Sequence, residues 1–270
     1  MQTKTPRRGT IRLTRRGRIA LIAAGAAAVA AAVAVPLLLP DDDKRPEALT
    51  IPEGWRSGQV YAAVDKVLEV PAGTTKKALP KADLKLPKDA GGNPEGYLFP
   101  ATYPISSQST PASVLSYMVN TANKKFGAGQ VTAGAGRNAL NVYQSVTIAS
   151  MIEAEAGSKD EMGKVARVIY NRLDRGMPLQ MDSTINYALN RSTLATSERD
   201  TKINSPYNTY ARMGLPPTPI GNPGEEAMRA AINPTPGDWL YFVTVKPGDT
   251  RFTSDYQEHQ KNVGEFNKAK

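Results

Sequence analysis

The chain has 270 residues, no cysteine and one histidine, His259, which excludes disulfides and cysteine zinc sites and argues against a multi-histidine metal centre. Its net charge is +9, but residues 1–40 carry seven basic side chains and no acid, and the rest carries 27 basic and 25 acidic side chains. The basic excess is therefore a tail, and we expect no nucleic-acid partner.

An uncharged apolar run, residues 19–39, follows the tail at residues 1–18. A helix needs about 20 apolar residues to cross the hydrocarbon core. We therefore predict a single-pass transmembrane helix in the cell membrane, with a cytoplasmic N-terminus because the positive flank precedes it. A cleaved signal peptide is the alternative, since Ala32–Ala34 offers a small-residue cleavage pattern and Arg15–Arg16 resembles a twin-arginine signal.

The next segment, residues 40–93, begins as a linker. Residues Leu49–Val70 predict a short strand, a Pro-Glu-Gly turn and an amphipathic helix, and the following Lys, Pro, Ala and Gly residues predict loops with one short helix. A Thr-Pro entry predicts a helix over residues 110–126. The glycine-rich stretch at residues 127–137 predicts a flexible break.

Two longer helices are expected over residues 139–156 and 161–175. Pro, Gly and Asn dominate the chain from there to residue 224, followed by a short helix and the β-forming run at residues 239–245. Tyr97 and Phe99 are expected in the core. Helices followed by loops and a few strands indicate an α+β fold.

Two acids, Glu153 and Glu155, interrupt the apolar run "TIASMIEAEAG". The apolar stripe of the predicted helix consists of Val146, Ile148, Ala149, Ile152 and Ala156. At about 100° per residue the two acids point roughly 200° apart, so they cannot form the carboxylate pair of common glycosidases. One acid at an apolar boundary would have a raised pKa, which suits acid catalysis. The alternative is that both acids are solvated flanks of a core helix.

Several motifs occur in a fixed order from Pro94 to the C-terminus: "EGYLFPATY", "TIASMIEAEAG", "VARVIYNRLDRGMPLQMDSTINYAL", "SPYNTYARMGLPPTPIGNPG" and "WLYFVTV". In these residues the chain resembles the YceG-like endolytic murein transglycosylases (the MltG family). The resemblance implies a membrane-anchored enzyme that cuts peptidoglycan strands internally, with residues 94–270 as the α+β catalytic domain.

The resemblance also implies the chemistry. Glu155, the second glutamate of the Glu-x-Glu segment, would protonate the MurNAc-GlcNAc glycosidic oxygen and then accept the proton of the muramic C6 hydroxyl. The product would be a 1,6-anhydromuramic end, formed without a metal or other cofactor.

Other residues match the family motifs as substrate-binding or supporting positions. Each could contact sugar or could hold a loop in place. They are Glu153, Asn171, Arg172, Gln180, Asp182, Asn208, Thr209 and Tyr210. No chemistry is assigned to His259.

The resemblance implies peptidoglycan glycan strands and the membrane as partners, with cell-wall synthases of the divisome or elongasome as further candidates. Many members carry a longer LysM-like module, so residues 40–93 are interpreted as a shortened LysM-like segment, and whether it binds glycan stays open. The alternative function is a non-catalytic peptidoglycan-binding scaffold of the division or elongation machinery.

Overall fold

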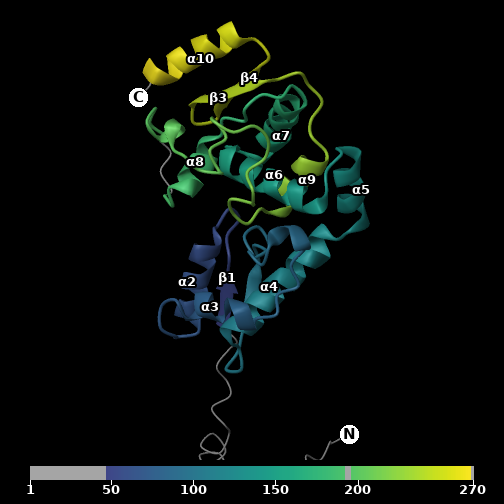
Figure 1. The fold of residues 1–270 in the computed structure, drawn as a ribbon, viewed down its shortest axis with the longest axis vertical. Helices are drawn as coiled ribbons and strands as arrows, with labels where there is room; N and C mark the ends of the chain where they lie inside the picture. The colour runs from purple at the N-terminus through teal and green to yellow at the C-terminus, as the bar shows by residue number, and fades with distance from the viewer. Residues whose placement is uncertain (1–46, 192–195, 269–270) are drawn as a thin grey trace, which may run out of the picture. The chain divides into compact units, whose positions relative to one another are not determined.

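The computed structural model describes residues 47–191 and 196–268 (Figure 1). The predicted tail and transmembrane run, residues 1–39, lie outside this part. Within the described ranges no helix is both long and apolar enough to cross a membrane. The described residues from Glu47 onward belong to one compact unit.

The N-terminal elements of this unit match their prediction. Strand β1 (Glu47–Thr50) pairs antiparallel with β2 (Thr102–Ile105), which places Leu49 opposite Tyr103. Helix α2 (Ser57–Val67) buries its apolar side completely at Val60 and Val64. Strand β1 lies in the predicted segment at residues 40–93 and β2 lies in the predicted domain at residues 94–270. This strand pair therefore connects the two segments.

Helix α6 (Val142–Glu155) lies near the middle of the unit and packs against the helices α5, α7, α8 and α9 (Figure 1). Two helices begin at capping residues. Thr110 Oγ1 accepts a hydrogen bond from Ser113 N–H, and Asn141 Oδ1 accepts one from Gln144 N–H. The helices that follow α2 are α3 (Thr74–Ala78), α4 (Pro111–Phe126), α5 (Gly129–Arg137), α6 (Val142–Glu155), α7 (Lys159–Asp174), α8 (Asp182–Ala188), α9 (Glu225–Ile232) and α10 (Tyr256–Lys268), with 3₁₀ turns at Leu79–Lys81, Lys88–Ala90 and Asp200–Lys202.

The flexible break expected at residues 127–137 is wrong, because this stretch forms α5. Its glycines disfavour a helix locally, but they let α5 approach α9 closely. A Cβ at Gly134 would lie 2.7 Å from Ile232 Cβ, and Val131 and Ala135 beside it are buried. Burial against α9 outweighs the low propensity.

Two glycines of α5 give a matched test of this contact. Gly134→Ala should destabilise the fold by about 1–3 kcal/mol, because the added methyl group overpacks the α5–α9 contact. Gly136→Ala should stabilise it by up to about 1 kcal/mol, because a Cβ there meets no heavy atom within 4 Å and alanine favours a helix. Urea unfolding measures both. A stable Gly134→Ala protein would show that α5 is held in another way.

Helix α6 is buried more completely than the predicted stripe requires. Every residue from Ser145 to Ile152 is buried. Two of its buried hydroxyl groups are satisfied inside the helix, because Thr147 Oγ1 donates to Tyr143 O and Ser150 Oγ donates to Thr147 O. The stripe prediction is therefore corrected to a helix enclosed on all sides, with its two acids at the C-terminal end.

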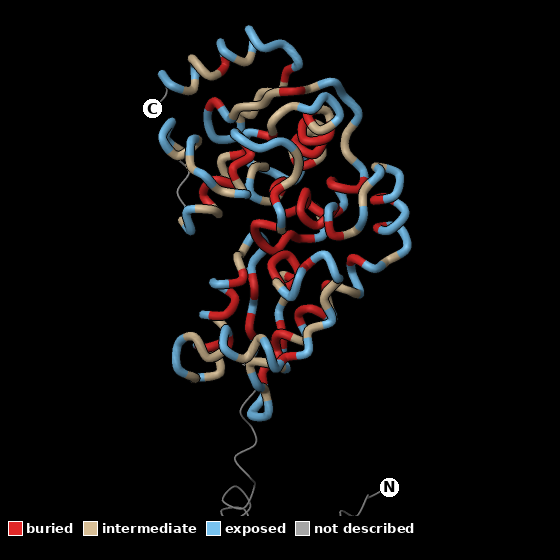
Figure 2. Tube along the Cα trace, viewed as in Figure 1, coloured by how far each residue is buried: buried red, intermediate tan, exposed pale blue. Residues whose placement is uncertain are grey.

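A β-hairpin and a helix complete the chain. Strand β3 (Tyr241–Lys246) confirms the predicted β-forming run and pairs antiparallel with β4 (Asp249–Thr253). Helix α10, which the sequence analysis did not predict, packs against both strands (Figure 1) and is mostly exposed on its other side (Figure 2). Tyr97 and Phe99 are core residues as predicted, with 2% and 5% of their surface exposed.

Candidate active site

Glu155 is the last residue of α6 and is half-buried. Its Oε1 accepts two hydrogen bonds from the start of α8, one from Ser183 N–H at 3.1 Å and one from Ser183 Oγ at 2.6 Å. No described residue donates to Oε2. The carboxyl group is thus held at one oxygen, while the other has no hydrogen bond from a described residue.

The pKa of Glu155 is raised above the ordinary value of a glutamate. Desolvation is the main cause, and the negative charge of Asp182 adds to it, whereas the two Ser183 hydrogen bonds act in the opposite direction. With Oε1 occupied as an acceptor, Oε2 is where a proton would reside. The group can therefore act as an acid towards a molecule placed beside Oε2.

Ser183→Ala should raise the pKa of Glu155 further, because the ionised carboxylate loses a charge-assisted hydrogen bond. A catalytic acid must be protonated in the free enzyme, so kcat/KM falls as pH rises through its pKa. We expect the alkaline limb of the kcat/KM profile for peptidoglycan cleavage to move to higher pH in Ser183→Ala. A limb that stays in place would mean that another group controls it.

Glu153 contacts a different part of the molecule. Its Oε2 accepts from Gly224 N–H at 3.1 Å, at the N-terminus of α9. Burial is the main cause of its raised pKa. The geometric prediction is confirmed, since the two acids reach different elements. Neither is a freely solvated flank.

Asn171 and Arg172 of α7 hold neighbouring backbone in place. Asn171 Nδ2 donates to Trp239 O at 2.8 Å. Arg172 donates to Leu240 O through Nε at 2.7 Å and to Leu179 O through Nη1 at 2.8 Å. These hydrogen bonds hold the residues just before β3 and the loop before α8 in place relative to α7.

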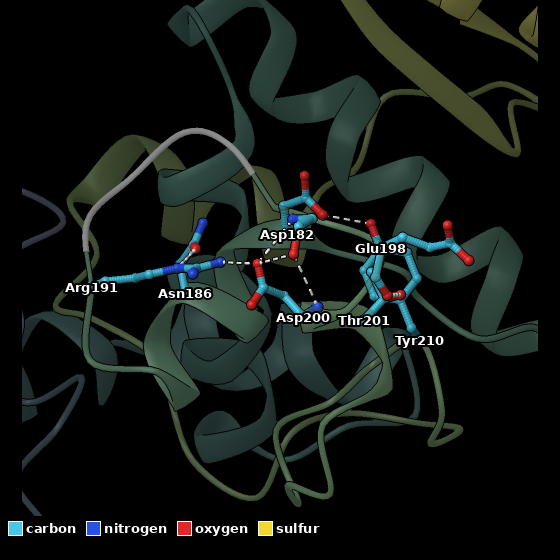
Figure 3. Close-up of polar contacts among 8 residues, drawn as sticks. Asp182, Asn186, Arg191, Glu198, Asp200, Thr201 and Tyr210 are labelled. Carbon is cyan, nitrogen blue, oxygen red and sulfur yellow. Dashed lines mark hydrogen bonds and ion pairs between the residues drawn. The ribbon is translucent and has the colours of Figure 1, made fainter.

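The loop before α8 carries two other predicted residues. Gln180 is exposed, has a left-handed backbone (φ +54°), and donates its N–H to Thr209 O at 3.0 Å. Asp182 begins α8 and accepts a hydrogen bond from the Tyr210 hydroxyl at 2.5 Å (Figure 3). Asp182 and Tyr210 both interact electrostatically with Glu155. The structure therefore brings these two residues together beside the acid.

The other two predicted site residues of the "YNTY" segment, Asn208 and Thr209, are buried and hydrogen-bonded. Asn208 Nδ2 donates to Thr201 O and Ile203 O, while its Oδ1 accepts from Tyr210 N–H. Thr209 Oγ1 accepts from Met181 N–H at 3.0 Å. They position the loop that leads into α8.

Two further contacts hold the C-terminal end of α8. Arg191 forms an ion pair of 2.6 Å with Asp200 and donates to Asn186 Oδ1 (Figure 3). The hydrogen bond from Arg191 is the main reason why the pKa of Asp200 lies well below its usual range. Both contacts tie the C-terminal end of α8 to the 3₁₀ turn at Asp200–Lys202.

Sequence reasoning missed Ser183 and Glu95. Ser183 lies inside the quoted "LQMDST" motif, but only the folded chain shows that its hydroxyl reaches Glu155. Glu95 is buried and accepts from Ser57 N–H at 2.9 Å and from the Tyr187 hydroxyl at 3.0 Å. The sequence signal that could have identified Glu95 is its position directly before the aromatic "GYLFP" run. Glu95 joins α2 to α8, the helix that holds Glu155.

The described residues contain no group of three His, Asp or Glu side chains placed to hold a metal ion. Glu155 is the half-buried carboxyl group with a raised pKa that lies at the junction of α6 and α8.

Comparisons with known proteins agree with the sequence resemblance. The profile of the YceG-like family matches residues 24–265, so the match starts earlier than the motifs quoted from Pro94. A Bacillus subtilis (strain 168) protein named endolytic murein transglycosylase is 39% identical over 168 residues, which are 62% of this chain and 46% of the relative. A protein of the same name from Streptococcus pneumoniae serotype 2 (strain D39) is 34% identical over 249 residues, 82% of this chain and 45% of the relative.

This chain spans about half the length of the curated relatives it matches. A crystal structure of a YceG-like protein from Listeria monocytogenes is similar in fold, with a TM-score of 0.68 and 29% identity, over 81% of this chain and 76% of that one. The α+β fold and the motifs thus agree with one family. Because the family profile covers nearly the whole sequence, this chain belongs to the YceG-like family.

Proposed function

We propose that this chain is an endolytic murein lytic transglycosylase that cleaves the MurNAc-GlcNAc β-1,4 bond within glycan strands. The observation that carries the proposal is the Glu155 carboxyl group, held at Oε1 by Ser183 and without a hydrogen bond from a described residue at Oε2, with a raised pKa. The family membership and the names of the two bacterial relatives support the same reaction.

Glu155 serves as both acid and base. Its carboxyl O–H gives a proton to the glycosidic oxygen as the bond from that oxygen to muramic C1 breaks. The carboxylate then takes the proton of the muramic C6 hydroxyl while the C6 oxygen bonds to C1. The proton count of Glu155 is restored, a 1,6-anhydromuramic end remains, and no water is consumed. A single residue can do both steps when its pKa is raised and it lies within hydrogen-bond reach of both oxygens.

The other site residues divide into two groups under this proposal. Gln180, Asp182 and Tyr210 contact the sugars, because Gln180 is exposed and the Tyr210–Asp182 pair lies beside Glu155. The remaining residues position the backbone around the site, because their hydrogen bonds go mainly to backbone groups. They are Glu153, Asn171, Arg172, Asn208 and Thr209.

We also propose the remaining organisation from the sequence. Residues 1–18 are a cytoplasmic tail and residues 19–39 a transmembrane helix, so the catalytic domain at residues 94–270 works outside the cytoplasm. Residues 40–93 act as a shortened LysM-like segment. Cell-wall synthases of the divisome or elongasome are the protein partners, since an enzyme that cuts new strands internally must meet them where they are made.

The test is the chemical nature of the product. The full chain in detergent is incubated with purified peptidoglycan, and the soluble fragments are analysed by mass spectrometry. We expect 1,6-anhydromuramic ends. Reducing muramic ends would instead identify a hydrolase. Sedimentation with peptidoglycan without any cleavage would favour the non-catalytic scaffold.

A further inference from the structure

A cavity of about 510 Å³ lies between α10, the start of β3 and the loop that leads into α8. This volume is within the range of small-molecule sites. Its lining includes Arg172, Gln180, Tyr241, Tyr256, His259 and Asn267. Gln180 links the cavity to the active site, because it lies three residues before Ser183, the partner of Glu155.

The cavity has a positive charge without a balancing acid. Arg172 is 6% exposed, and no described carboxylate lies within ion-pair distance of it. Its Nη2 has no hydrogen-bond partner among the described residues. A buried charge is normally paired. The lining contains no Asp or Glu, and the nearby acids of α10 are occupied: Glu265 by Arg251 and Glu258 by Thr253.

The other residues that line the cavity are mainly aromatic and polar, which suits an organic ligand. The Tyr241 ring lies 5.3 Å from Arg172 Cζ and stacks on the His259 ring at 5.0 Å, with Tyr256 at 5.6 Å. Nδ1 of His259 is buried without a hydrogen-bond partner among the described residues. Amide groups of Gln180 and Asn267 complete the lining. Gln180 Oε1 already accepts from Arg172 Nη1 at 3.2 Å, so the site offers one cation, aromatic faces and the unused Nδ1 of His259.

We propose that this cavity binds the carboxylate-bearing stem peptide of the murein substrate, with Arg172 contacting the carboxylate and Tyr241 and Tyr256 contacting the peptide backbone. The proposal rests on the proposed function. Where the lactyl carboxyl group of muramic acid is amide-bonded to a stem peptide, the N-acetylated sugars of the glycan backbone are uncharged. The anionic group that such a murein strand presents to an unpaired arginine is therefore on the stem peptide. Arginine recognises carboxylates in a planar, directional manner.

The test fills the cavity without touching Arg172. Gly264 of α10 lines the cavity, and a Cβ there meets no heavy atom within 4 Å, so Gly264→Leu should fold and occupy the space. Gly136→Leu is the matched control, because Gly136 is also helical and open but lies on α5. Leucine favours a helix at both positions, so neither protein should have a lower Tm.

Binding is measured by titration calorimetry on the full chain in detergent. The probes are N-acetylmuramoyl dipeptide, its fully amidated form, and chitotetraose, an uncharged N-acetylglucosamine tetramer. We expect Gly264→Leu to weaken binding of the charged dipeptide at least tenfold and to leave chitotetraose unchanged, with Gly136→Leu like the wild type. Equal binding of the charged and amidated dipeptides, or an unchanged Kd in Gly264→Leu, would overturn the proposal.

A cleavage assay separates the two proposals. The wild type should cleave stem-bearing glycan faster than glycan stripped of its stems, and Gly264→Leu should lose that preference. Equal cleavage of both substrates by the wild type would overturn the cavity proposal and leave the transglycosylase intact. Dipeptide binding at this cavity without cleavage of either substrate would overturn the proposed function and leave the peptide site standing.

Discussion

Glu155→Gln should reduce peptidoglycan cleavage by about 10²–10⁴-fold, the usual contribution of a general acid–base group. Glutamine keeps the shape of the side chain, and its amide oxygen can still accept from Ser183. It cannot give or take the proton. The release of anhydromuramic ends, followed over time by mass spectrometry, measures the effect.

The stability of Glu155→Gln should change in the opposite direction. A folded-state pKa above the unfolded value favours the protonated form, so the stabilisation is complete below the unfolded pKa and is lost as pH rises through the folded pKa. At pH 7, which is above the ordinary pKa of a glutamate, a carboxyl group whose folded-state pKa is raised therefore costs stability, and a neutral glutamine does not. We expect the Tm at pH 7 to be at or above that of the wild type.

Glu153→Gln is the matched control, since this acid lies two residues away on the same helix but contacts Gly224. Its cleavage rate should stay within a few-fold of the wild type, because the amide oxygen can still cap α9. A loss of activity equal to that of Glu155→Gln would mean that the two acids act as a unit. An active, correctly folded Glu155→Gln protein would remove the acid from the mechanism.

Asn208→Ala should destabilise the fold by about 2–4 kcal/mol, because each buried polar group left unpaired costs about 1–3 kcal/mol. The side chain is completely buried. Its amide satisfies the carbonyls of Thr201 and Ile203 and the N–H groups of Tyr210 and Ala211. Chemical denaturation measures the loss.

Two variants control this result. Asn208→Asp keeps the acceptor for the two N–H groups but cannot donate to the two carbonyls and places a buried carboxylate beside them, so its loss should be at least as large as that of Asn208→Ala. Asn120→Ala removes an exposed asparagine of α4 and should change stability by no more than about 0.5 kcal/mol. If Asn208→Ala were as stable as Asn120→Ala, the loop at residues 201–211 would be held by other contacts.

The elements predicted correctly are those whose cause lies within a few residues. Thr110 and Asn141 cap helices through bonds to residues three positions later. The divergence of Glu153 and Glu155 follows from helical periodicity alone. Such signals depend only on residues a few positions apart, so they do not change with the surroundings of the helix.

The elements missed or mispredicted have causes far away in the chain. Helix α5 exists because Gly134 packs against Ile232 of α9, and α10 packs against the hairpin of β3 and β4. The low helix propensity of its glycines is the reason why the sequence did not predict α5. Helix α5 forms because burial of its face against α9 outweighs what its own residues prefer.

By itself, the sequence determined the α+β class, the family resemblance and the lack of thiol chemistry, and the resemblance made Glu155 the candidate acid, because composition, periodicity and ordered motifs need no coordinates. Only the tertiary structure decided that Ser183 holds one oxygen of this acid and that Arg172 borders a cavity as an unpaired cation. The physical reason is that a pKa and a binding site depend on which groups surround a side chain, and those groups come from elements that only folding brings together.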